Sequence, residues 1–243
     1  MTQPATNKSI TYLNESPFEI PFPENALDEP DGLCAMGGDL SKTRLINMYQ
    51  HGFFPWYSEP DPILWWHPKE RCALFPTDFH LSRSLKKHIK KQTWTVKVNT
   101  SFSDVIQACS DSRADKEGTW ISNDIKNAYS ALHRSGVAHS IEVWEGDLLI
   151  GGLYGVCLGR VFFGESMFSR KENASKTALY ALCQHANAAN IHLIDCQVES
   201  DHLITLGATL IPRIKFCDLL DDYCTPPQLN GYLQLNSILP IQV

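Results

Sequence analysis

The spacing of hydrophobic residues divides the chain near residue 70. Beyond this point, short apolar runs alternate with longer segments whose apolar residues recur every three or four positions. Short apolar runs bounded by turn residues predict buried strands, and the longer periodic segments predict amphipathic helices. The clearest helix covers 123–136. Within it, Ile125, Tyr129 and Leu132 fall on one face, and Gly136 ends the pattern.

The elements predicted after Arg71 follow an order that indicates a mixed sheet. The predicted strands are 72–76, 94–99, a three-strand meander at 139–166, 191–198 and 208–216. The predicted helices are 82–91, 101–110, 123–136, 174–188 and 200–207. A meander followed by strand, helix and strand predicts an α/β fold, with a mixed (α+β type) sheet and helices on both faces. This order resembles the acyl-CoA N-acetyltransferase fold.

The first 70 residues differ, because they are dense in proline, glycine and aromatic residues. One helix is predicted at 42–51, where Ser41 can cap the amino end. We therefore predict a small loop-rich N-terminal domain at 1–70. An acetyltransferase-like catalytic domain would take 71–243 and end in a proline-bearing C-terminal tail beyond Tyr223.

Composition limits the classes of function. The chain has 243 residues, of which 43% are hydrophobic, and this is enough for a substantial core. Acidic residues outnumber basic ones by 27 to 21, whereas dedicated polyanion-binding domains are usually basic overall. No stretch has the length and apolarity of a signal peptide or a bilayer-spanning helix. We expect a cytoplasmic, soluble monomer without a membrane partner, in which polyanion binding is limited to a local patch.

Eight cysteines raise the question of disulfides or a metal site. None stands in a Cys-x-x-Cys pair, no histidine pair accompanies them at zinc-finger spacing, and several lie inside apolar runs. Free cysteine in such runs behaves as a small hydrophobic residue. We expect buried free thiols and no metal.

Three polar residues stand where buried strands are predicted to end. Asp195 and Gln197 point to one face of their strand, because side chains alternate along it. Glu165 follows the apolar run 161–163, so we expect it in a strand-to-helix turn, where open α/β sheets often hold a ligand. Buried carboxylates at such points are typical of active sites. The alternatives are a solvated strand end for Asp195, and for Glu165 pairing with Arg170 or capping of the next helix.

Aromatic residues are crowded in FFPWYS at 53–58 and ILWWHP at 63–68. Most of them should form the core of the small domain. They cannot all be buried in so short a segment, so one or two are candidates for stacking on a nucleic-acid base. Trp120, in the predicted turn at 118–122, is another candidate.

The helix predicted at 82–91 is basic and contains no acidic residue. Its cations are Arg83, Lys86, Lys87, Lys90 and Lys91. A solvated helix face is the ordinary explanation of such a run. The alternative is contact with a phosphate backbone, for which uncompensated cations are suited.

The sequence closely resembles the leucyl/phenylalanyl-tRNA–protein transferases through motifs that occur together and in order. They are GGDLS (37–41), FPWYS (54–58), DPILWWHP (61–68), GTWI (118–121), HSIEVW (139–144), GESMFSRKENASKTAL (164–179) and LIDCQV (193–198). The resemblance implies a small N-terminal domain followed by an acetyltransferase-like domain. It also implies an enzyme that moves Leu or Phe from aminoacyl-tRNA to the N-terminal Arg or Lys of a protein, marking it for degradation, without a cofactor.

The resemblance further implies roles for the polar residues. Asp195 would work through Gln197 to help the attacking amine, and Glu165 would either orient this network or bind the cationic acceptor. The basic helix at 82–91 would meet the acceptor stem of the tRNA. Since such contacts go to phosphates, little dependence on tRNA sequence is expected.

By the same resemblance, the remaining site residues would bind the donor. Trp56 and Trp120 would hold the terminal adenosine, and Tyr129 would lie nearby. Leu153 and Met167 would belong to an apolar pocket for the Leu or Phe side chain. Methionine suits a pocket that takes both shapes, because its side chain is flexible and polarizable.

Two other classes of function fit parts of the sequence. A coenzyme A-dependent acetyltransferase fits the predicted fold, but Asn173 and Ser175 stand where its phosphate-binding loop would have glycines. A non-catalytic RNA-binding adaptor fits the basic helix, but it has no need of Asp195 and Gln197 at the end of a strand. The transferase is therefore the preferred hypothesis.

Overall fold

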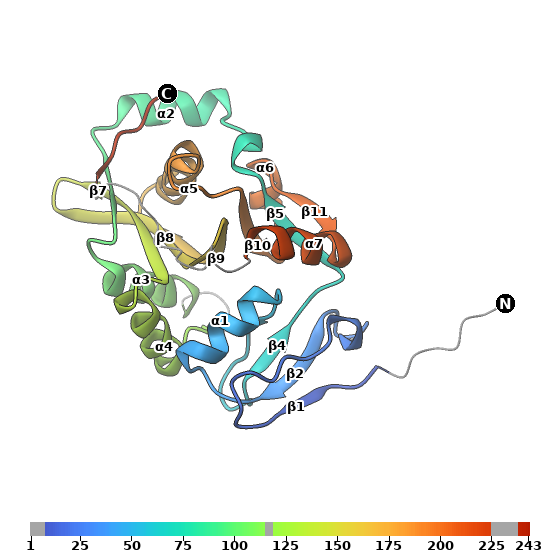
Figure 1. Cartoon of the computed structure of the whole chain (residues 1–243). Helices are drawn as coiled ribbons and strands as arrows, with labels where there is room; N and C mark the ends of the chain where they lie inside the picture. Colours follow the sequence, from blue (N-terminus) through green and yellow to red (C-terminus); the bar gives the residue numbers. More distant parts are fainter. Residues whose placement is uncertain (1–7, 115–118, 225–237) are drawn as a thin grey trace.

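The computed structural model describes residues 8–114, 119–224 and 238–243, and it contains two β-sheets (Figure 1). The smaller sheet has the strand order β1-β2-β4-β3. Its strands are β1 (Thr11–Leu13), β2 (Leu33–Gly37), β3 (Phe54–Pro55) and β4 (Leu64–Trp66). The short helix η1 (Pro23–Asn25) and the α-helix α1 (Lys42–Gln50) complete this part of the chain.

The larger sheet has the strand order β11-β5-β10-β9-β8-β7-β6-β12. Its strands are β5 (Glu70–Leu74), β6 (Thr95–Val98), β7 (Ala138–Glu145), β8 (Leu148–Leu158), β9 (Val161–Ser169), β10 (Leu193–Gln197), β11 (Thr209–Pro212) and β12 (Ile238–Leu239). Only β9 and β10 run parallel, and the other neighbours are antiparallel. The sheet is therefore mixed, as the order of elements predicted.

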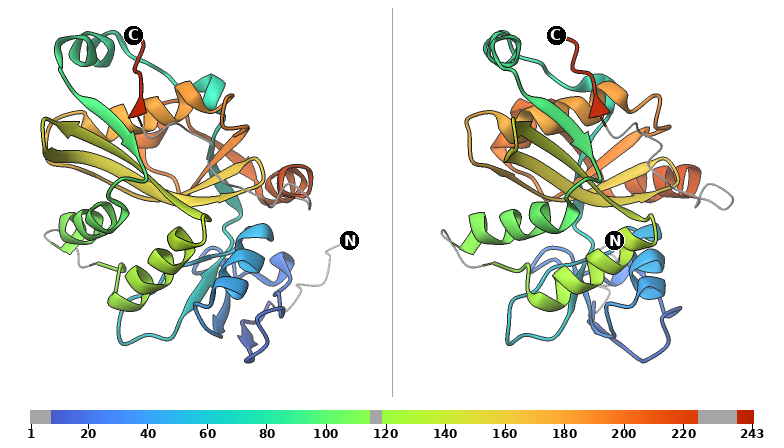
Figure 2. Two further views of the ribbon diagram at one scale, coloured as in Figure 1. Left: turned by 60° about the vertical axis from the view of Figure 1, so that its left-hand side comes forward. Right: turned by 90° about the vertical axis from the view of Figure 1, so that its left-hand side faces the viewer.

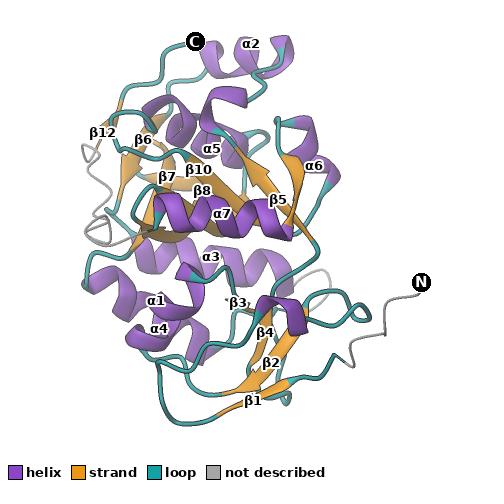
Figure 3. Cartoon of the chain, turned by 45° about the vertical axis from the view of Figure 1, so that its right-hand side comes forward, coloured by secondary structure: helices purple, strands orange, loops and turns teal. Residues whose placement is uncertain are grey.

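Helices cover both faces of the larger sheet (Figures 2 and 3). The helices after β5 are η2 (Pro76–Asp78), α2 (Arg83–Lys91), α3 (Phe102–Ala114), α4 (Asn123–Arg134), α5 (Ala174–His185), α6 (Asp201–Thr205) and α7 (Arg213–Tyr223). Apolar residues of α2 and α5 form one core with the sheet, and those of α1, α3, α4 and α7 form a second core on the other face. The second core also includes the small sheet, so the two sheets share buried surface.

Most predicted elements are present, and their caps follow the sequence. The Ser41 hydroxyl accepts a hydrogen bond from the Arg44 amide at 3.3 Å and begins α1. Gly52 follows the helix with φ of +82°, a conformation that favours glycine. The mixed α/β sheet with helices on both faces is confirmed. The boundary between the two predicted domains, at residue 70, stays a prediction.

One prediction about the end of the chain is wrong. The predicted strand 208–216 ends at Pro212, where β11 stops and α7 begins. Proline cannot donate to a sheet ladder, and the buried Phe216 and Leu220 lie four residues apart, which is helical spacing. Within the predicted tail, β12 pairs with β6 at an edge of the sheet. The rest of that tail, with Pro226 and Pro227, lies outside the described residues.

Two further expectations concern cysteines and membranes. All eight cysteines are free, and six of them are buried, as expected from their apolar surroundings. Cys196 and Cys217 are half-buried. Within the described ranges, no helix combines the length and the apolarity that a bilayer crossing requires.

Candidate active site

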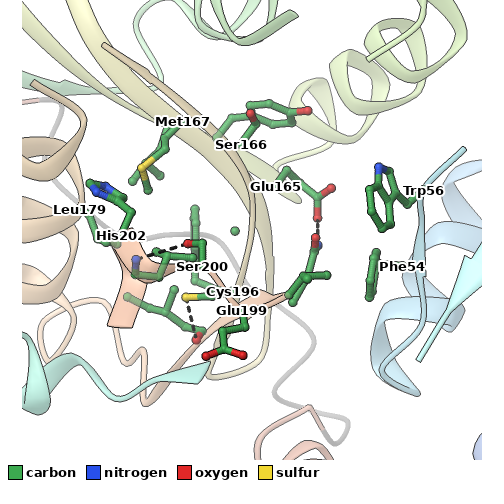
Figure 4. Close-up of a pocket in the computed structure, with 18 of the residues that line it drawn as sticks. Phe54, Trp56, Glu165, Ser166, Met167, Leu179, Cys196, Glu199, Ser200 and His202 are labelled. Carbon is green, nitrogen blue, oxygen red and sulfur yellow. Dashed lines mark hydrogen bonds between the residues drawn. The ribbon is translucent and has the colours of Figure 1, made fainter. Parts of the chain in front are cut away.

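A cavity of about 350 Å³ lies between the small sheet and the strands β8, β9 and β10 (Figure 4). This volume is in the range of small-molecule binding sites. Figure 4 shows Phe54 and Trp56 on one side of the cavity and Met167, Leu179 and His202 on the other. Glu165 lies between these two groups. The cavity therefore has an aromatic end, a polar middle and an opposite end, here called the apolar end, where Met167 and Leu179 lie beside His202.

Glu165 in the polar middle is held by three neutral donors. Its Oε1 accepts hydrogen bonds from the Tyr49 hydroxyl at 2.7 Å and the Gln197 Nε2 at 2.8 Å. Its Oε2 accepts from the Tyr129 hydroxyl at 3.0 Å. Burial raises the pKa of Glu165 from 4.5 to about 7, although the three hydrogen bonds favour the charged form. The carboxyl is thus poised to titrate near neutral pH.

Asp195 is held differently, by a full ion pair. Its two carboxylate oxygens accept hydrogen bonds from Arg71 Nε at 2.8 Å and Arg71 Nη2 at 2.7 Å. Both side chains have no exposed surface. The Arg71 guanidinium also lies over the rings of Phe54 and Phe216, at 4.7 Å and 4.6 Å from their centroids. This packing fixes the charged end of Asp195 beneath the cavity.

Gln197 connects the two carboxylates. Its backbone amide donates to Asp195 Oδ1 at 2.9 Å, while its side chain donates to Glu165. Its φ is +64°, in the left-handed region that non-glycine residues seldom adopt. Because the Asp195 contact holds this turn of the backbone, the ion pair with Arg71 indirectly sets the direction of the Gln197 amide.

Two irregularities in neighbouring strands bring these side chains together. In β9, Gly164 pairs with Gly155 and Ser166 pairs with Tyr154, so Glu165 is an extra residue without a partner on β8. In β10, the register with β5 shifts between Asp195 and Gln197. Such bulges redirect side chains and are frequent beside active sites.

The expected location of Glu165 in a strand-to-helix turn is wrong, because β9 continues to Ser169. Apolar and polar positions do not alternate cleanly across the bulge, so the sequence pattern did not predict that the strand continues beyond it. Neither structural alternative for Glu165 holds. Arg170 Nη1 donates instead to the Leu149 carbonyl oxygen at 3.0 Å, and the amide of Ser175 at the start of α5 donates to the Ser169 hydroxyl rather than to Glu165.

The aromatic end contains the two tryptophans that the sequence singled out. Trp56 is 45% exposed, whereas its neighbours Phe54 and Trp65 are buried in the core. The Trp66 indole donates to the Trp56 carbonyl oxygen at 2.6 Å and fixes the backbone there. Trp120, half-buried in the loop before α4, lines the same cavity. Two aromatic faces are therefore brought to one end of the site.

The apolar end contains both residues predicted for a side-chain pocket. Leu153 and Met167 are paired across β8 and β9, and both line the cavity. Phe162, Leu179 and Ile194 line it as well, although the sequence did not single them out. They lie on β9, α5 and β10, so only the folded chain brings them together.

Family models match most of the chain. The N-terminal domain model of leucyl/phenylalanyl-tRNA protein transferase matches residues 38–69, and the main model of that family matches residues 73–221. The chain belongs to the leucyl/phenylalanyl-tRNA–protein transferase family. The resemblance drawn from the motifs is confirmed, and membership makes the protein an aminoacyltransferase.

Curated members of the family are similar over almost their full length. The leucyl/phenylalanyl-tRNA–protein transferase of Shewanella piezotolerans is 52% identical, over 97% of this chain and 99% of its own. That of Pseudomonas fluorescens is 49% identical, over 92% of this chain and 99% of its own.

Solved structures are much more distant. FemX is 13% identical and has a TM-score of 0.44, over 71% of this chain and 67% of its own. L-PGS from Bacillus licheniformis is 10% identical and has a TM-score of 0.40, over 70% of this chain and 57% of its own. Likeness at this level carries no argument about function.

Other predicted site residues lie outside the cavity. Tyr129 is fully buried behind Glu165, and its hydroxyl also contacts that of Tyr49. The five cations of α2 are exposed, at the end of the molecule away from the small sheet (Figures 1 and 3). None of them forms an ion pair with a residue that the structure describes.

Sequence reasoning missed two residues that hold the site together. Tyr49 is buried on the apolar face of α1, and a buried tyrosine hydroxyl usually requires a partner. Arg71 stands at the start of a strand that is otherwise buried, and a buried arginine likewise requires a carboxylate. These two requirements were the available signals, but neither identifies the partner.

Proposed function

We propose that the protein transfers Leu or Phe from aminoacyl-tRNA to the N-terminal Arg or Lys of acceptor proteins, which marks them for degradation. One observation carries this proposal beyond family membership. Gln197 lines a cavity that has an aromatic and an apolar end, its backbone N–H donates to the buried Asp195, and its side-chain amide donates to the buried Glu165. A donor with an adenosine and an apolar side chain would therefore have its ester carbonyl beside Gln197.

The donor would lie along the cavity with its adenosine at the aromatic end. The exposed face of Trp56 and the half-buried Trp120 are suited to stacking on the terminal base. The aminoacyl side chain would enter the apolar end beside Leu153 and Met167. An unbranched methionine can adjust to Leu or Phe, which supports a donor range that includes both.

The reaction forms one bond and breaks one. The acceptor amine attacks the ester carbonyl carbon, a peptide bond forms, and the bond from that carbon to the ribose oxygen breaks. The proton lost by the amine ends on the departing ribose oxygen. Because the ester is already activated, most of the rate enhancement can come from holding the amine and the carbonyl in place.

Gln197 would orient the amine. Its Nε2 is engaged with Glu165, so its Oε1 is the atom left to accept a hydrogen bond from the attacking amine. Asp195 would act on Gln197 through the backbone amide contact, by holding the left-handed turn. A fixed hydrogen-bond acceptor beside the attacking amine is the arrangement that this attack requires.

Glu165 would be a positioning residue for Gln197 rather than the partner of the acceptor's cationic side chain. Both of its oxygens already accept hydrogen bonds, and it is 6% exposed. Three donors fill most of the roughly four acceptor positions of a carboxylate, and its burial leaves little room for an arginine or lysine side chain to approach. The three-donor arrangement therefore favours the orienting role.

The body of the tRNA would contact α2. Its five cations are exposed on a helix that buries only Leu85 and Ile89. Such a surface can contact phosphates without reading bases. Since the chain has a net charge of −6, we expect modest affinity with a strong dependence on salt.

The strand-to-helix turn argues against coenzyme A as the donor. The Ser175 amide at the start of α5 already donates to the Ser169 hydroxyl at 2.8 Å, and the Ala174 amide donates to the Lys171 carbonyl oxygen at 3.1 Å. Amides engaged in this way are not free to bind a pyrophosphate. A non-catalytic adaptor would not require the buried carboxylates around Gln197.

The test is the transfer of radiolabelled leucine from Leu-tRNA to a protein with N-terminal Arg. The control acceptor is the same protein with N-terminal Ala. Label on the Arg protein alone is the expected result. Label on neither acceptor, with folded enzyme and intact Leu-tRNA, would overturn the proposal.

A further inference from the structure

Among the described residues that line the cavity, one is a permanent cation, and it has no role in the proposed transfer reaction. This cation is Arg113, in the last turn of α3. Among the described residues, no carboxylate lies within ion-pair distance of its guanidinium. A cation left unpaired in a ligand cavity is suited to an anionic group of the ligand.

We propose that Arg113 binds the phosphate on the 5′ side of the terminal adenosine of aminoacyl-tRNA. The inference rests on the proposed function, because it concerns the donor of that reaction. It adds a recognition element between the stacked base and the rest of the tRNA chain.

The Arg113 side chain is oriented by β9. Its Nε donates to the Ser166 hydroxyl at 3.1 Å, and Ser166 directly follows Glu165. Its terminal nitrogens make no hydrogen bond to a residue that the structure describes. The part of the guanidinium that best binds a phosphate is therefore available, while its stem is fixed.

Arg113 is also tied to the aromatic end of the cavity. One turn earlier in α3, the Ser110 hydroxyl donates to the Ile121 carbonyl oxygen at 3.1 Å. Ile121 directly follows Trp120, so this bond holds the tryptophan loop against the carboxyl end of α3. A phosphate bound at Arg113 would thus belong to a nucleotide whose base reaches Trp120.

A second polar group beside Arg113 lacks a partner. The Tyr154 hydroxyl is fully buried, lines the cavity, and has no hydrogen-bond partner among the described residues. Tyr154 pairs with Ser166 across β8 and β9, and the Ser166 hydroxyl accepts the hydrogen bond from Arg113 Nε, so Tyr154 lies next to the residue that holds Arg113. A phosphate oxygen would supply the acceptor that the hydroxyl lacks.

The chemistry of the two substrates favours the donor as the ligand. The acceptor brings an amine and a basic side chain, which a guanidinium repels. The donor brings one negatively charged phosphodiester next to the adenosine. A purely structural role is the alternative, because a cation in the last turn stabilises a helix through its dipole. That role predicts no dependence on the phosphate.

The test compares two stable donor mimics that differ only in the phosphate. Both carry leucine on the 3′ position of adenosine through an amide in place of the ester. One has a free 5′-hydroxyl, and the other has a 5′-methyl phosphate diester. Calorimetry on the full chain should give a dissociation constant about tenfold lower for the phosphate mimic, the scale of one charge-assisted hydrogen bond.

The variants then locate the effect. Arg113→Gln should bind both mimics equally, and Arg113→Lys should retain part of the preference because it keeps the charge but loses the planar fork. Arg134→Gln is the matched control, since Arg134 is an exposed arginine in the last turn of α4 that does not line the cavity. It should keep the full preference.

Two results would overturn the inference. One is equal affinity of the wild-type protein for both mimics, or binding of neither. The other is a preference that survives in Arg113→Gln. Failure of the proposed function is seen separately, as the absence of leucine transfer from intact Leu-tRNA to an acceptor with N-terminal Arg by the wild-type protein.

Discussion

The floor of the cavity and the surface of α2 both gather charged groups, but their surroundings differ completely. On the floor, Asp195 and Arg71 are fully buried and form two hydrogen bonds, and Glu165 has three donors. On α2, five cations are exposed, and none has an ion-pair partner among the described residues. The two regions therefore use charge in different ways.

The difference follows from the solvent around each region. A buried charge must be matched by fixed partners, and those partners fix its geometry in turn. An exposed charge is screened by water and salt, so its individual effect is small. Binding then depends on the summed charge of neighbouring side chains. We expect single substitutions to have large, local effects on the cavity floor and small, additive effects on α2.

The largest effect is expected for Asp195→Ala, which leaves the Arg71 charge buried without a partner. Breaking a buried pair on one side costs about 3–5 kcal/mol of unfolding free energy. Leucine transfer should fall to background, because the left-handed turn at Gln197 loses its acceptor. Chemical denaturation and the transfer assay measure the two effects.

The double variant Asp195→Ala with Arg71→Met separates charge from mechanism. Replacing both members of a buried pair by neutral side chains often restores stability. The double variant should therefore regain most of the unfolding free energy without regaining transfer. Recovery of transfer together with stability would show that Asp195 has only a structural role.

Gln197→Ala should have the next largest effect. It removes the side-chain amide but leaves the ion pair of Asp195 with Arg71. We therefore expect kcat to fall about 100-fold, the size of loss seen when reactants are misplaced, with an unchanged KM for Leu-tRNA. Steady-state kinetics with an Arg-bearing acceptor measure it. Gln107→Ala, on the exposed face of α3, is the control and should be silent. A change in KM alone would indicate that Gln197 binds the donor instead.

The same contrast explains what the sequence could predict. Elements with a clear period were found, among them α4 and the meander, because their apolar spacing reports one buried face. The basic face of α2 was also found, since exposed charge needs no partner to be recognised. The carboxylates were identified as candidates from their position in buried strands.

The arrangement of the cavity floor was not predictable from local pattern. Arg71 and Asp195 lie 124 positions apart in the chain, and no spacing rule links them. The bulges at Glu165 and Cys196 break the period of two on which strand prediction depends. The three-donor site around Glu165 likewise joins α1, α4 and β10, which only the tertiary fold brings together.

Glu165→Gln tests how the neutral donors affect titration. The folded protein binds the Glu165 proton more tightly than the unfolded chain, because its pKa is raised from 4.5 to about 7. The stability from this group is therefore fully present below pH 4.5 and is lost as the pH rises through about 7. The loss is on the order of 3 kcal/mol. The glutamine variant lacks this titration.

Chemical denaturation of both proteins at pH values from about 4 to about 8, which span the titration of such a carboxyl, measures how their unfolding free energies differ. The unfolding free energy of the wild-type protein should decrease relative to that of Glu165→Gln across this interval. Glu199→Gln removes an exposed carboxylate that lines the same cavity, and it is the control for the loss of one negative charge there. Parallel curves for Glu165→Gln would contradict a raised pKa.

The smallest effect is expected on α2. Lys87→Ala should weaken tRNA binding only a few-fold and leave stability unchanged, because the side chain is exposed and unpaired among the described residues. The salt dependence of binding distinguishes this effect. Loss of one phosphate contact should reduce the slope of the logarithm of the binding constant against the logarithm of the salt concentration by about 1. Lys215→Ala, an exposed lysine on α7, is the control. An unchanged slope in Lys87→Ala would show that this lysine does not contact the tRNA. An equal reduction of the slope in both variants would indicate that net charge, rather than the position of α2, controls binding.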